Sequence, residues 1–470
     1  MNIIGIIFYF VIAIGILVLI HEFGHFISAK LSGMRADIFS FGMGYRLFGW
    51  NKKTGFTFGK LPDDWDGEGH TDYRLSLFPI GGYVKIAGMV DESFDTEYAE
   101  QEPKPYEFRS KNTFIKAFVI SAGVIMNVLL AILIFSITAF IEGKTIIETT
   151  TVAYVKNGSI ADRLGFKVGD EIVSINGKSV TEEIDGKEHK SWKKCFDYLI
   201  LDVVKSNNDS IHIYIIRNGK DTTLNHNNAW LLSSIENKDT FGISPSNFSV
   251  VINRVLKDVP AETIGLASGD TIYAINKEPI NSSEELTNTL SQNIGKKIFL
   301  QWKRNEAIMS DSVAPNQDGR LGIEISDVYT GAISNKKYNL LEAIEVGANK
   351  TWGAVELFVA SVYKMFKGLL SVEKNLGGII TVAQQSAIQA QRGIINFMEF
   401  IGFLSITLAL INILPIPALD GGHLVFIIIE GIIGREIPVR VKLRFQQIGF
   451  FLLMLLIAFT IYVDIKRIFF

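Results

Sequence analysis

The stretch that decides the fold is "VLIHEFGHFI", residues 18–27, in which two histidines and a glutamate follow an uncharged apolar run. Residues 3–20 carry no charged side chain, and about 20 apolar residues are enough for a helix to cross the hydrocarbon core of a bilayer. Ionisable groups at membrane depth are costly and usually mark a functional site. The stretch therefore predicts a first membrane-spanning helix that ends in such a site.

The composition indicates a membrane protein with sizeable soluble parts. The chain has 470 residues, 48% of them hydrophobic, and a formal net charge of −3, so it has no surplus of positive charge for binding nucleic acid. Three more apolar stretches are long enough to cross a bilayer. We expect a polytopic α-helical membrane protein with about four transmembrane helices, in residues 1–30, 113–141, 393–434 and 445–467.

Basic side chains near the spans predict their orientation. They follow the first span, precede the second and separate the third from the fourth, at Lys30, Arg35, Arg109, Lys111, Lys116, Arg435, Arg440, Lys442 and Arg444. Cytoplasmic flanks carry the excess of Lys and Arg, so these flanks are expected in the cytoplasm, and both termini and residues 142–392 are expected outside it. Lys466 and Arg467 point the other way, but three flanks outweigh one. The N-terminus lacks the basic region and cleavage site of a signal peptide.

An internal repeat lies in the part expected outside the cytoplasm. The stretch "IADRLGFKVGDEIVSINGKSV" (160–180) matches "PAETIGLASGDTIYAINKEPI" (260–280), with Gly165 at the position of Gly265. In each copy Gly-Asp precedes an alternating apolar run and an Asn turn, which predicts a turn, a strand and a second turn. An alternating strand is expected later in each copy, after a predicted helix over 191–201 and 283–292.

The two copies resemble PDZ domains, in the permuted form found in bacterial envelope proteases. We therefore expect two tandem PDZ-like α+β domains, over residues 150–245 and 246–330. PDZ domains bind an extended peptide as an added strand and hold its terminal carboxylate with backbone N–H groups near a glycine, so Gly165 and Gly265 are the candidate ligand loops. Peptide binding or substrate gating is one interpretation. Two modules that only space or shield another part of the chain are the other.

His21, Glu22 and His25 form an H-E-x-x-H motif. On a helix, side chains four residues apart share a face, so both imidazoles can reach one metal ion. Zinc suits imidazole ligands, and a catalytic zinc site combines three protein ligands with an open position for water. Glu22 is placed to take a proton from that water. The motif predicts a zinc hydrolase with His21 and His25 as ligands and Glu22 as the catalytic base.

The third ligand is predicted in "NILPIPALDGGHLVF" (412–426), at the end of the third span. Its prolines break the helix and its glycines let the backbone hold a carboxylate at a fixed point, which favours Asp420. Irregular backbone at membrane depth is tolerated where it lines a wet cavity, and a metal pocket provides one. The predicted topology places the ends of the first and third spans on the same side. His423, three residues further on, is the rival ligand.

Together these motifs resemble the site-2 protease family of intramembrane zinc proteases. The resemblance rests on H-E-x-x-H in the first span, N-x-x-P-x-P-x-L-D-G-G in the third and the two PDZ-like repeats, and it covers essentially the whole chain. It implies Zn²⁺ held by His21, His25 and Asp420, with Glu22 as the base. It also implies that Asn412 steadies the substrate peptide or the oxyanion, although capping a helix is an alternative role for Asn412.

Residues 31–112 are expected to form a cytoplasmic or membrane-associated β region. The stretches "FSFGMGYRLFGW" (39–50) and "YRLSLFPIGGYVKIAGM" (73–89) alternate and carry paired glycines, which predicts strands and a hairpin. In the family such strands present the substrate as an added strand. The resemblance therefore implies substrate contacts at Gly81, Gly82 and Tyr83, whereas an ordinary cytoplasmic β module is the alternative.

Three other features carry limited predictions. The polar insert 51–70 has no assigned role, and His70 within it is expected to be a solvated loop residue. Residues 339–392 have helical apolar spacing with scattered charges, which predicts an amphipathic helical connector at the membrane surface or against the repeats. Cys195 is the single cysteine, so an internal disulfide is excluded and a buried structural thiol is expected.

The sequence thus predicts a zinc metalloendopeptidase in a membrane, and the resemblance implies the bacterial cytoplasmic membrane with the repeats on the periplasmic side. By resemblance, its partners are single-span membrane proteins already trimmed by another protease, such as an anti-sigma factor or a remnant signal peptide, and the repeats admit only trimmed substrates. A zinc-dependent membrane receptor or scaffold is the competing class, and it needs no base at Glu22. A metal transporter would carry more intramembrane carboxylates and histidines.

Overall fold

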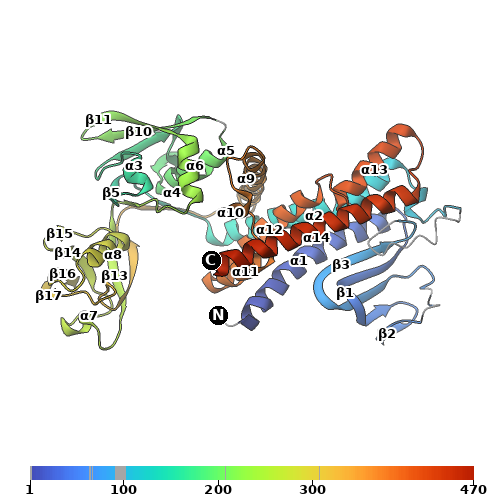
Figure 1. Ribbon diagram of the computed structural model, residues 1–470, viewed down its shortest axis with the longest axis horizontal. Helices are drawn as coiled ribbons and strands as arrows, with labels where there is room; N and C mark the ends of the chain where they lie inside the picture. The colour runs from blue at the N-terminus through green and yellow to red at the C-terminus, as the bar shows by residue number, and fades with distance from the viewer. Residues whose placement is uncertain are drawn as a thin grey trace. The chain divides into compact units, whose positions relative to one another are not determined.

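The computed structural model describes residues 3–62, 65, 67–89, 102–206, 208–305 and 307–469 (Figure 1). The chain divides into two compact units. The first comprises Met1–Glu142, Tyr338–Val359 and Glu373–Phe470, and the second comprises Gly143–Lys337 and Ala360–Val372. The long apolar helices belong to the first unit, and the two copies of the repeat belong to the second.

Four helices within the described ranges are long and apolar enough to cross a membrane. They are α1 (Ile3–Leu31), α2 (Thr113–Glu142), α12 (Ile394–Asn412) and α14 (Val439–Phe469). Helix α2 packs against both α1 and α12, and their common core includes Leu17, Phe135, Phe397 and Ile401. The first unit therefore has the architecture of a multi-pass membrane protein.

Small residues bring these helices close together. A Cβ atom on Gly24 of α1 would lie 2.4 Å from the carbonyl oxygen of Ala122 on α2, and one on Gly402 of α12 would lie 2.8 Å from the ring of Phe135. Helices in lipid associate through such close contacts, because lipid tails are as apolar as the side chains themselves. The backbone of α2 therefore approaches the face of α1 that carries the histidines.

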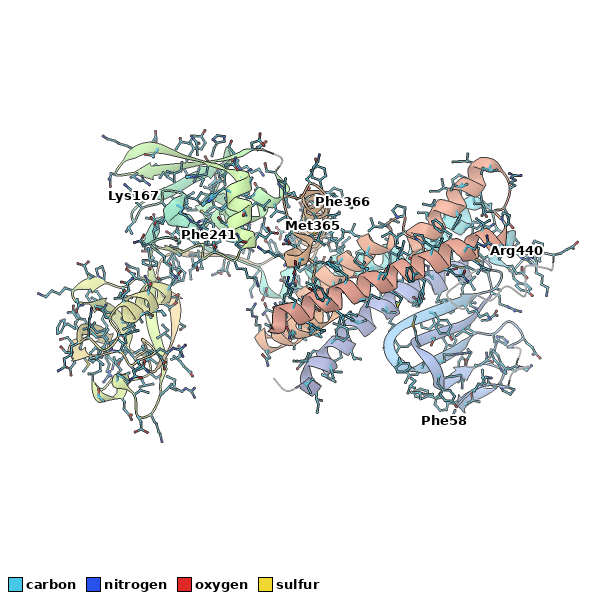
Figure 2. The ribbon with its side chains drawn as sticks, viewed as in Figure 1. Phe58, Lys167, Phe241, Met365, Phe366 and Arg440 are labelled. Atoms are coloured by element: carbon cyan, nitrogen blue, oxygen red, sulfur yellow. The ribbon has the colours of Figure 1, made fainter. Side chains whose placement is uncertain are left out.

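The segment 393–434, expected as the third span, contains two helices. Helix α12 ends at Asn412, the chain turns through Pro415 and Pro417, and α13 (Asp420–Ile433) starts at the aspartate of the Leu-Asp-Gly-Gly stretch. Proline interrupts a helix because it lacks the N–H that the ladder of hydrogen bonds requires. Helix α13 packs against α2. Arg440, labelled in Figure 2, lies in the first turn of α14.

The connector expected at 339–392 consists of three helices: α9 (Leu340–Phe366), α10 (Val372–Asn375) and α11 (Ile379–Arg392). Helix α11 packs against α1, α12 and α14. Its first turn is capped from α14, because the Asp464 carboxylate accepts hydrogen bonds from the N–H groups of Gly378, Ile380 and Thr381 at 2.9–3.1 Å. Such a cap satisfies N–H groups that have no partner inside the helix.

A small sheet follows α1 in the order β2–β1–β3. The strands are β1 (Ala36–Asn51), β2 (Gly55–Phe58) and β3 (Asp72–Ile86). Residues 38–41 of β1 pair with residues 72–75 and also with residues 82–85, so β3 lies on both sides of this part of β1. Strand β3 also packs against α1. A 3-10 turn, η2 (Phe108–Ser110), precedes α2.

A buried ion pair holds this sheet together. Arg46 of β1 donates to both carboxylate oxygens of Asp72 of β3, at 3.1 and 3.0 Å, and these two side chains are 4% and 0% exposed. Arg46 also donates to the carbonyls of Thr57 and Gly59, at 3.1 and 2.8 Å. Phe58, labelled in Figure 2, lies on the outer strand β2 and is 76% exposed.

In the second unit each copy of the repeat forms its own sheet and core. The first copy contains β5 (Val152–Val155), α3 (Ile160–Arg163), β6 (Glu171–Ile175), β7 (Lys178–Ser179), β8 (Thr181–Ile184), β9 (Lys187–Lys190), α4 (Trp192–Phe196), the π-helical turn η3 (Asp197–Leu201), α5 (Asp202–Lys205), β10 (Ser210–Arg217), β11 (Lys220–Asn227), α6 (Asn228–Glu236) and β12 (Ile243–Pro245). Its buried core includes Cys195, Leu199 and Ile213.

The second copy contains β13 (Phe248–Val255), α7 (Pro260–Thr263), β14 (Thr271–Ile275), β15 (Glu278–Pro279), α8 (Ser283–Gln292), β16 (Ile298–Arg304), β17 (Ala307–Val313) and β18 (Ile323–Tyr329). The strand order is β17–β16–β14–β13–β18, and Trp302 lies at its core. A two-stranded pair of β4 (Lys144–Ile147) with β19 (Ile333–Lys336) joins the segments before and after the two copies.

Candidate metal centre

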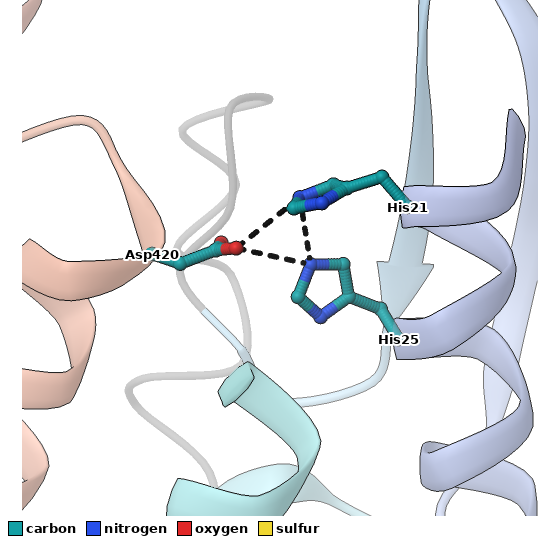
Figure 3. A group of neighbouring side chains, drawn as sticks. All are labelled: His21, His25 and Asp420. Carbon is teal, nitrogen blue, oxygen red and sulfur yellow. Dashed lines mark hydrogen bonds and ion pairs between the residues drawn. The ribbon is translucent and has the colours of Figure 1, made fainter. Parts of the chain in front are cut away.

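Two histidines of α1 and one aspartate of α13 converge on a single point (Figure 3). His21 and His25 lie one turn apart on α1, so their rings share a face. The Nε2 atoms of the two rings are 3.3 Å apart. Asp420 Oδ2 lies 3.2 Å from Nε2 of His21 and 3.4 Å from Nε2 of His25. The three side chains predicted as ligands are therefore brought together.

The loop before α13 fixes the Asp420 carboxylate. Both glycines that follow Asp420 are needed for close packing: a Cβ on Gly421 would lie 2.1 Å from the carbonyl oxygen of Leu414, and one on Gly422 would lie 2.5 Å from that of Ile416. Ala418 has a φ of +73°, a conformation that costs a non-glycine residue about 1–3 kcal/mol. Strained backbone of this kind is typical of functional sites.

The donor set fits zinc. Ligand atoms about 2.0–2.2 Å from a tetrahedral ion lie roughly 3.3–3.5 Å apart, which matches the three separations above. Asp420 Oδ2 is buried and faces the two Nε2 atoms, without a hydrogen bond of regular geometry to any residue that the structure describes. A buried oxygen without such a hydrogen bond is costly. Two imidazoles and one carboxylate are a common ligand set for catalytic zinc. These three residues would hold the ion and leave a fourth position open.

Glu22 lines a pocket of about 500 Å³ beside the three candidate ligands. Its carboxylate accepts a hydrogen bond from the backbone N–H of Val84 on β3. At Gly82 the same strand passes so close to α1 that a Cβ would lie 3.3 Å from Cγ of Glu22 and 3.2 Å from a methyl carbon of Val18. The candidate base is thus held between the metal-binding face of α1 and β3.

The other predicted site residues of the first unit line the same pocket. Gly81, Gly82 and Tyr83 of β3 contribute to its wall, and Asn412 stands at the end of α12. The Asn412 side-chain amide lies 3.3 Å from Nε2 of His21. His423 also lines the pocket, but it is not among the donor groups that cluster within 4.8 Å in the described part of the chain. The roles of all these residues remain predictions.

Helix α2 contributes contacts that sequence reasoning missed. The carbonyl oxygen of Val119 lies 2.9 Å from Nδ1 of His25, and the amide of Asn127 lies 3.2 Å from Nδ1 of His21. Between them, a Cβ on Gly123 would lie 2.5 Å from Nε2 of His25. The sequence offered one signal, because a buried Asn within an apolar span is unusual and tends to be functional.

The remaining predicted residues are not among those that line this pocket. Gly165 and Gly265 occupy turns with φ of +84° and +72°. Their carbonyls accept hydrogen bonds from Arg217 and Arg304, at 2.6 and 2.7 Å. A peptide role for these two glycines remains a prediction. His70 is exposed on its loop, as expected.

Cys195 is fully buried in the first copy of the repeat, as the sequence predicted. Its thiol donates to the carbonyl oxygen of Ser191 at 3.5 Å. Burial raises the pKa of this thiol to about 12, because an apolar environment disfavours the thiolate. Cys195 therefore belongs to the packing of this copy and carries no reactive group at neutral pH.

Comparison with known proteins places the chain in a family. The family model described as Peptidase family M50 matches residues 9–456. A protein of Neisseria meningitidis whose name describes it as a zinc metalloprotease is 30% identical, with 97% of this chain and 98% of that protein covered. Regulator of sigma-E protease RseP of Escherichia coli and regulator of sigma E protease of Haemophilus influenzae are each 28% identical, with the same coverage. The chain belongs to peptidase family M50 and is a zinc metalloprotease.

Proposed function

We propose that this chain is an intramembrane endopeptidase that cleaves single-span membrane proteins, in the inner membrane of a bacterium. One observation carries the proposal: the three candidate ligands and Glu22 line one pocket, and His21, Glu22 and His25 belong to a helix long and apolar enough to cross a bilayer. Ionisable groups are rare at such positions unless they serve a function. The motifs at both ends of the chain thus meet in one hydrolytic site.

The chemistry proposed for the site is hydrolysis of a peptide bond. His21, His25 and Asp420 would hold Zn²⁺, which would supply the Lewis-acid chemistry that polarises a carbonyl and acidifies water. Glu22 takes the proton of the attacking water and passes it to the leaving amine, as a general base and then a general acid. The hydrogen bond from Val84 keeps the Glu22 carboxylate directed into the pocket during these transfers.

The substrate is proposed to bind as an added strand. Strand β3 ends the sheet order β2–β1–β3, and its residues 81–86 line the pocket. An unpaired strand edge can accept an extended peptide through backbone hydrogen bonds. A substrate helix must unwind before cleavage, because its backbone groups are otherwise paired with one another. Gly81, Gly82 and Tyr83 would then lie along the extended substrate, with Asn412 near the scissile carbonyl.

The two copies of the repeat are proposed to be PDZ-like domains on the periplasmic side. In the second copy β18 ends the sheet and packs near α8, an arrangement that suits a peptide lying between a strand and a helix. Their proposed role is to select substrates by binding peptide ends or by excluding untrimmed external domains. Substrates would reach the site after a first cut by another protease.

The class of substrate follows from the relatives by analogy. The Escherichia coli and Haemophilus influenzae relatives are named as regulators of sigma-E protease. Regulated intramembrane proteolysis of an anti-sigma factor, or removal of remnant signal peptides, is accordingly proposed for this chain. Both substrates are single membrane spans with a short remaining external segment, so one site serves either.

Replacing the base tests the proposal. Purified wild-type chain is expected to cut a co-reconstituted single-span substrate, and mass spectrometry should place the cut inside or next to the span. Glu22→Gln should lower the rate by at least about 100-fold, since general-base catalysis contributes about 10²–10⁴, and should still bind zinc. Glu68→Gln, an exposed matched control, should cleave normally. Undiminished cleavage by Glu22→Gln would show that Glu22 is not the base, whereas no cleavage by the wild-type chain would favour the receptor or scaffold.

A further inference from the structure

Helix α2 contributes no candidate ligand, yet one row of its residues touches both imidazoles. Val119, Gly123 and Asn127 follow each other at intervals of four, so they lie on one face of the helix. The first meets the ring of His25 through its carbonyl, the second lies against both rings, and the third meets the ring of His21. This face of α2 therefore packs against the rings of both histidines.

The two rings use the same nitrogen toward the metal point. Nε2 of each faces Asp420 Oδ2, at 3.2 and 3.4 Å, so Nδ1 of each points back toward α2. An imidazole that binds a metal through Nε2 carries its proton on Nδ1 and needs an acceptor there. His25 has one, because the carbonyl oxygen of Val119 lies 2.9 Å from its Nδ1.

In the amide orientation that the structure shows, no equivalent acceptor faces Nδ1 of His21 among the described residues. The nitrogen Nδ2 of Asn127 faces Nδ1 of His21 at 3.2 Å. The oxygen Oδ1 of the same amide is buried and has no hydrogen-bond partner among the described residues. The two ends of an Asn amide are nearly the same size and differ only in donating or accepting. Turning the amide over lets Oδ1 of Asn127 accept a hydrogen bond from Nδ1–H of His21, so both of these buried atoms gain a partner.

Asn127 is held firmly enough for this task. Asn127 is 0% exposed, and its backbone carbonyl accepts a hydrogen bond of 2.7 Å from the Ser405 hydroxyl on α12. Gly123 leaves the room that the rings need, since a Cβ there would lie 2.5 Å from Nε2 of His25 and 2.7 Å from Cε1 of His21. The backbone of Asn127 is thus held in place, and its amide can turn over by rotation about χ2.

We propose that Asn127 is a positioning residue of the zinc site, whose Oδ1 accepts the Nδ1–H of His21 and so holds the imidazole in the form that binds zinc through Nε2. The inference rests on the proposed ligand set. It predicts that an acceptor at position 127 is what matters for zinc affinity, because the groups behind metal-bound histidines fix ring orientation and raise ligand basicity.

The test measures zinc affinity of the full chain in detergent by chelator competition, together with the visible spectrum of the Co²⁺ form. Asn127→Leu keeps the size but removes the acceptor, and should weaken zinc binding by about 10- to 100-fold. Asn127→Asp keeps an acceptor oxygen, and should bind zinc within a few-fold of wild type with an unchanged Co²⁺ spectrum. Thr138→Val, at another buried polar residue of α2, should leave both readouts unchanged.

Each outcome decides the matter. Weak binding by Asn127→Leu with rescue by Asn127→Asp supports the proposal. Wild-type zinc affinity in Asn127→Leu overturns the proposal, and so does weak zinc binding by Asn127→Asp. If Asn127→Leu does not fold, the zinc affinity of Asn127→Asp alone decides. His21→Ala tests the proposed ligand set separately. If its zinc affinity equals that of wild type, the proposed ligand set is wrong. If His21→Ala weakens zinc binding and Asn127→Leu does not, only the role of Asn127 is rejected.

Discussion

Nε2 of His21, near the start of the chain, lies 3.2 Å from Oδ2 of Asp420, near its end. The contact joins α1, about two-thirds of the way along the helix, to the first residue of α13. Neither element can complete a three-ligand site alone. The fold therefore couples the integrity of the whole first unit to the chemistry of the pocket.

The loop that carries Asp420 has no room for a side chain at Gly421. Gly421→Ala places a Cβ 2.1 Å from the carbonyl oxygen of Leu414 and 2.4 Å from that of Ile413, so the start of α13 must shift. Overpacking of this kind costs about 1–3 kcal/mol. We expect weaker zinc binding and slower cleavage, measured by chelator competition and by substrate turnover.

Gly377→Ala is the matched control for that variant. A Cβ at Gly377 meets only the side chain of Thr381, at 3.3 and 3.6 Å, and the residue has no left-handed φ. Zinc affinity and turnover should stay at the wild-type level. Equal behaviour of the two alanine variants would show that the loop before α13 does not position Asp420.

Each copy of the repeat depends on a buried aspartate under its Gly-Asp turn. Asp170 is fully buried and accepts two hydrogen bonds of 2.7 Å from Arg217, and this contact raises the pKa of Arg217. Asp170→Ala removes the carboxylate from the partly buried guanidinium, which keeps its hydrogen bond to the Gly165 carbonyl, and this should cost about 1–3 kcal/mol. Hydrogen exchange of β6 in the full chain should report faster local opening.

Asp221→Ala, at an exposed position of β11, should leave the exchange of β6 unchanged. The second copy repeats the arrangement, since Arg304 donates to Asp270 at 2.7 Å through Nε and Nη2. Asp270→Ala should accordingly loosen β14 and spare β6. Unchanged exchange in both aspartate variants would mean that these ion pairs do not hold the two copies together.

Cys195 provides a built-in reporter of unfolding. Burial raises the pKa of its thiol to about 12, so at pH 8 the thiol is protonated as well as inaccessible, and the thiolate is the reactive form. A maleimide should label the native chain very slowly at pH 8, and fast only in denaturant. Because Cys195 is the single cysteine, mass spectrometry gives the labelled fraction directly. Rapid labelling of the native chain would contradict the burial.

Much of the site could be predicted from local patterns. The spacing of His21 and His25 follows from the helix period, and the Pro-rich turn before Leu-Asp-Gly-Gly marked a break in an apolar run. Strands predicted from alternation over 39–50 and 73–89 lie within or largely overlap β1 and β3. The helix predicted at 283–292 is α8. Local chemistry and periodicity decide all of these features.

The contributions of α2 could not be predicted in the same way. Its sequence is a nearly uninterrupted apolar run, so period and composition do not show which face meets α1. Only the close approach of Gly24 to Ala122, and of Gly123 to the rings, selects Asn127 from the other residues of the helix. The double pairing of β1 with β3 likewise depends on long-range register that alternation does not encode.

The zinc content of two variants tests the central claim most directly. Purified wild-type chain, Asp420→Ala and His423→Ala should be assayed for zinc by elemental analysis after dialysis against a weak chelator, with folding checked by circular dichroism. The geometry predicts that wild type and His423→Ala retain zinc and that Asp420→Ala loses it, because among the described residues Asp420 is the one that completes the cluster with His21 and His25. Retention of zinc by folded Asp420→Ala, or its loss from folded His423→Ala, would contradict the account.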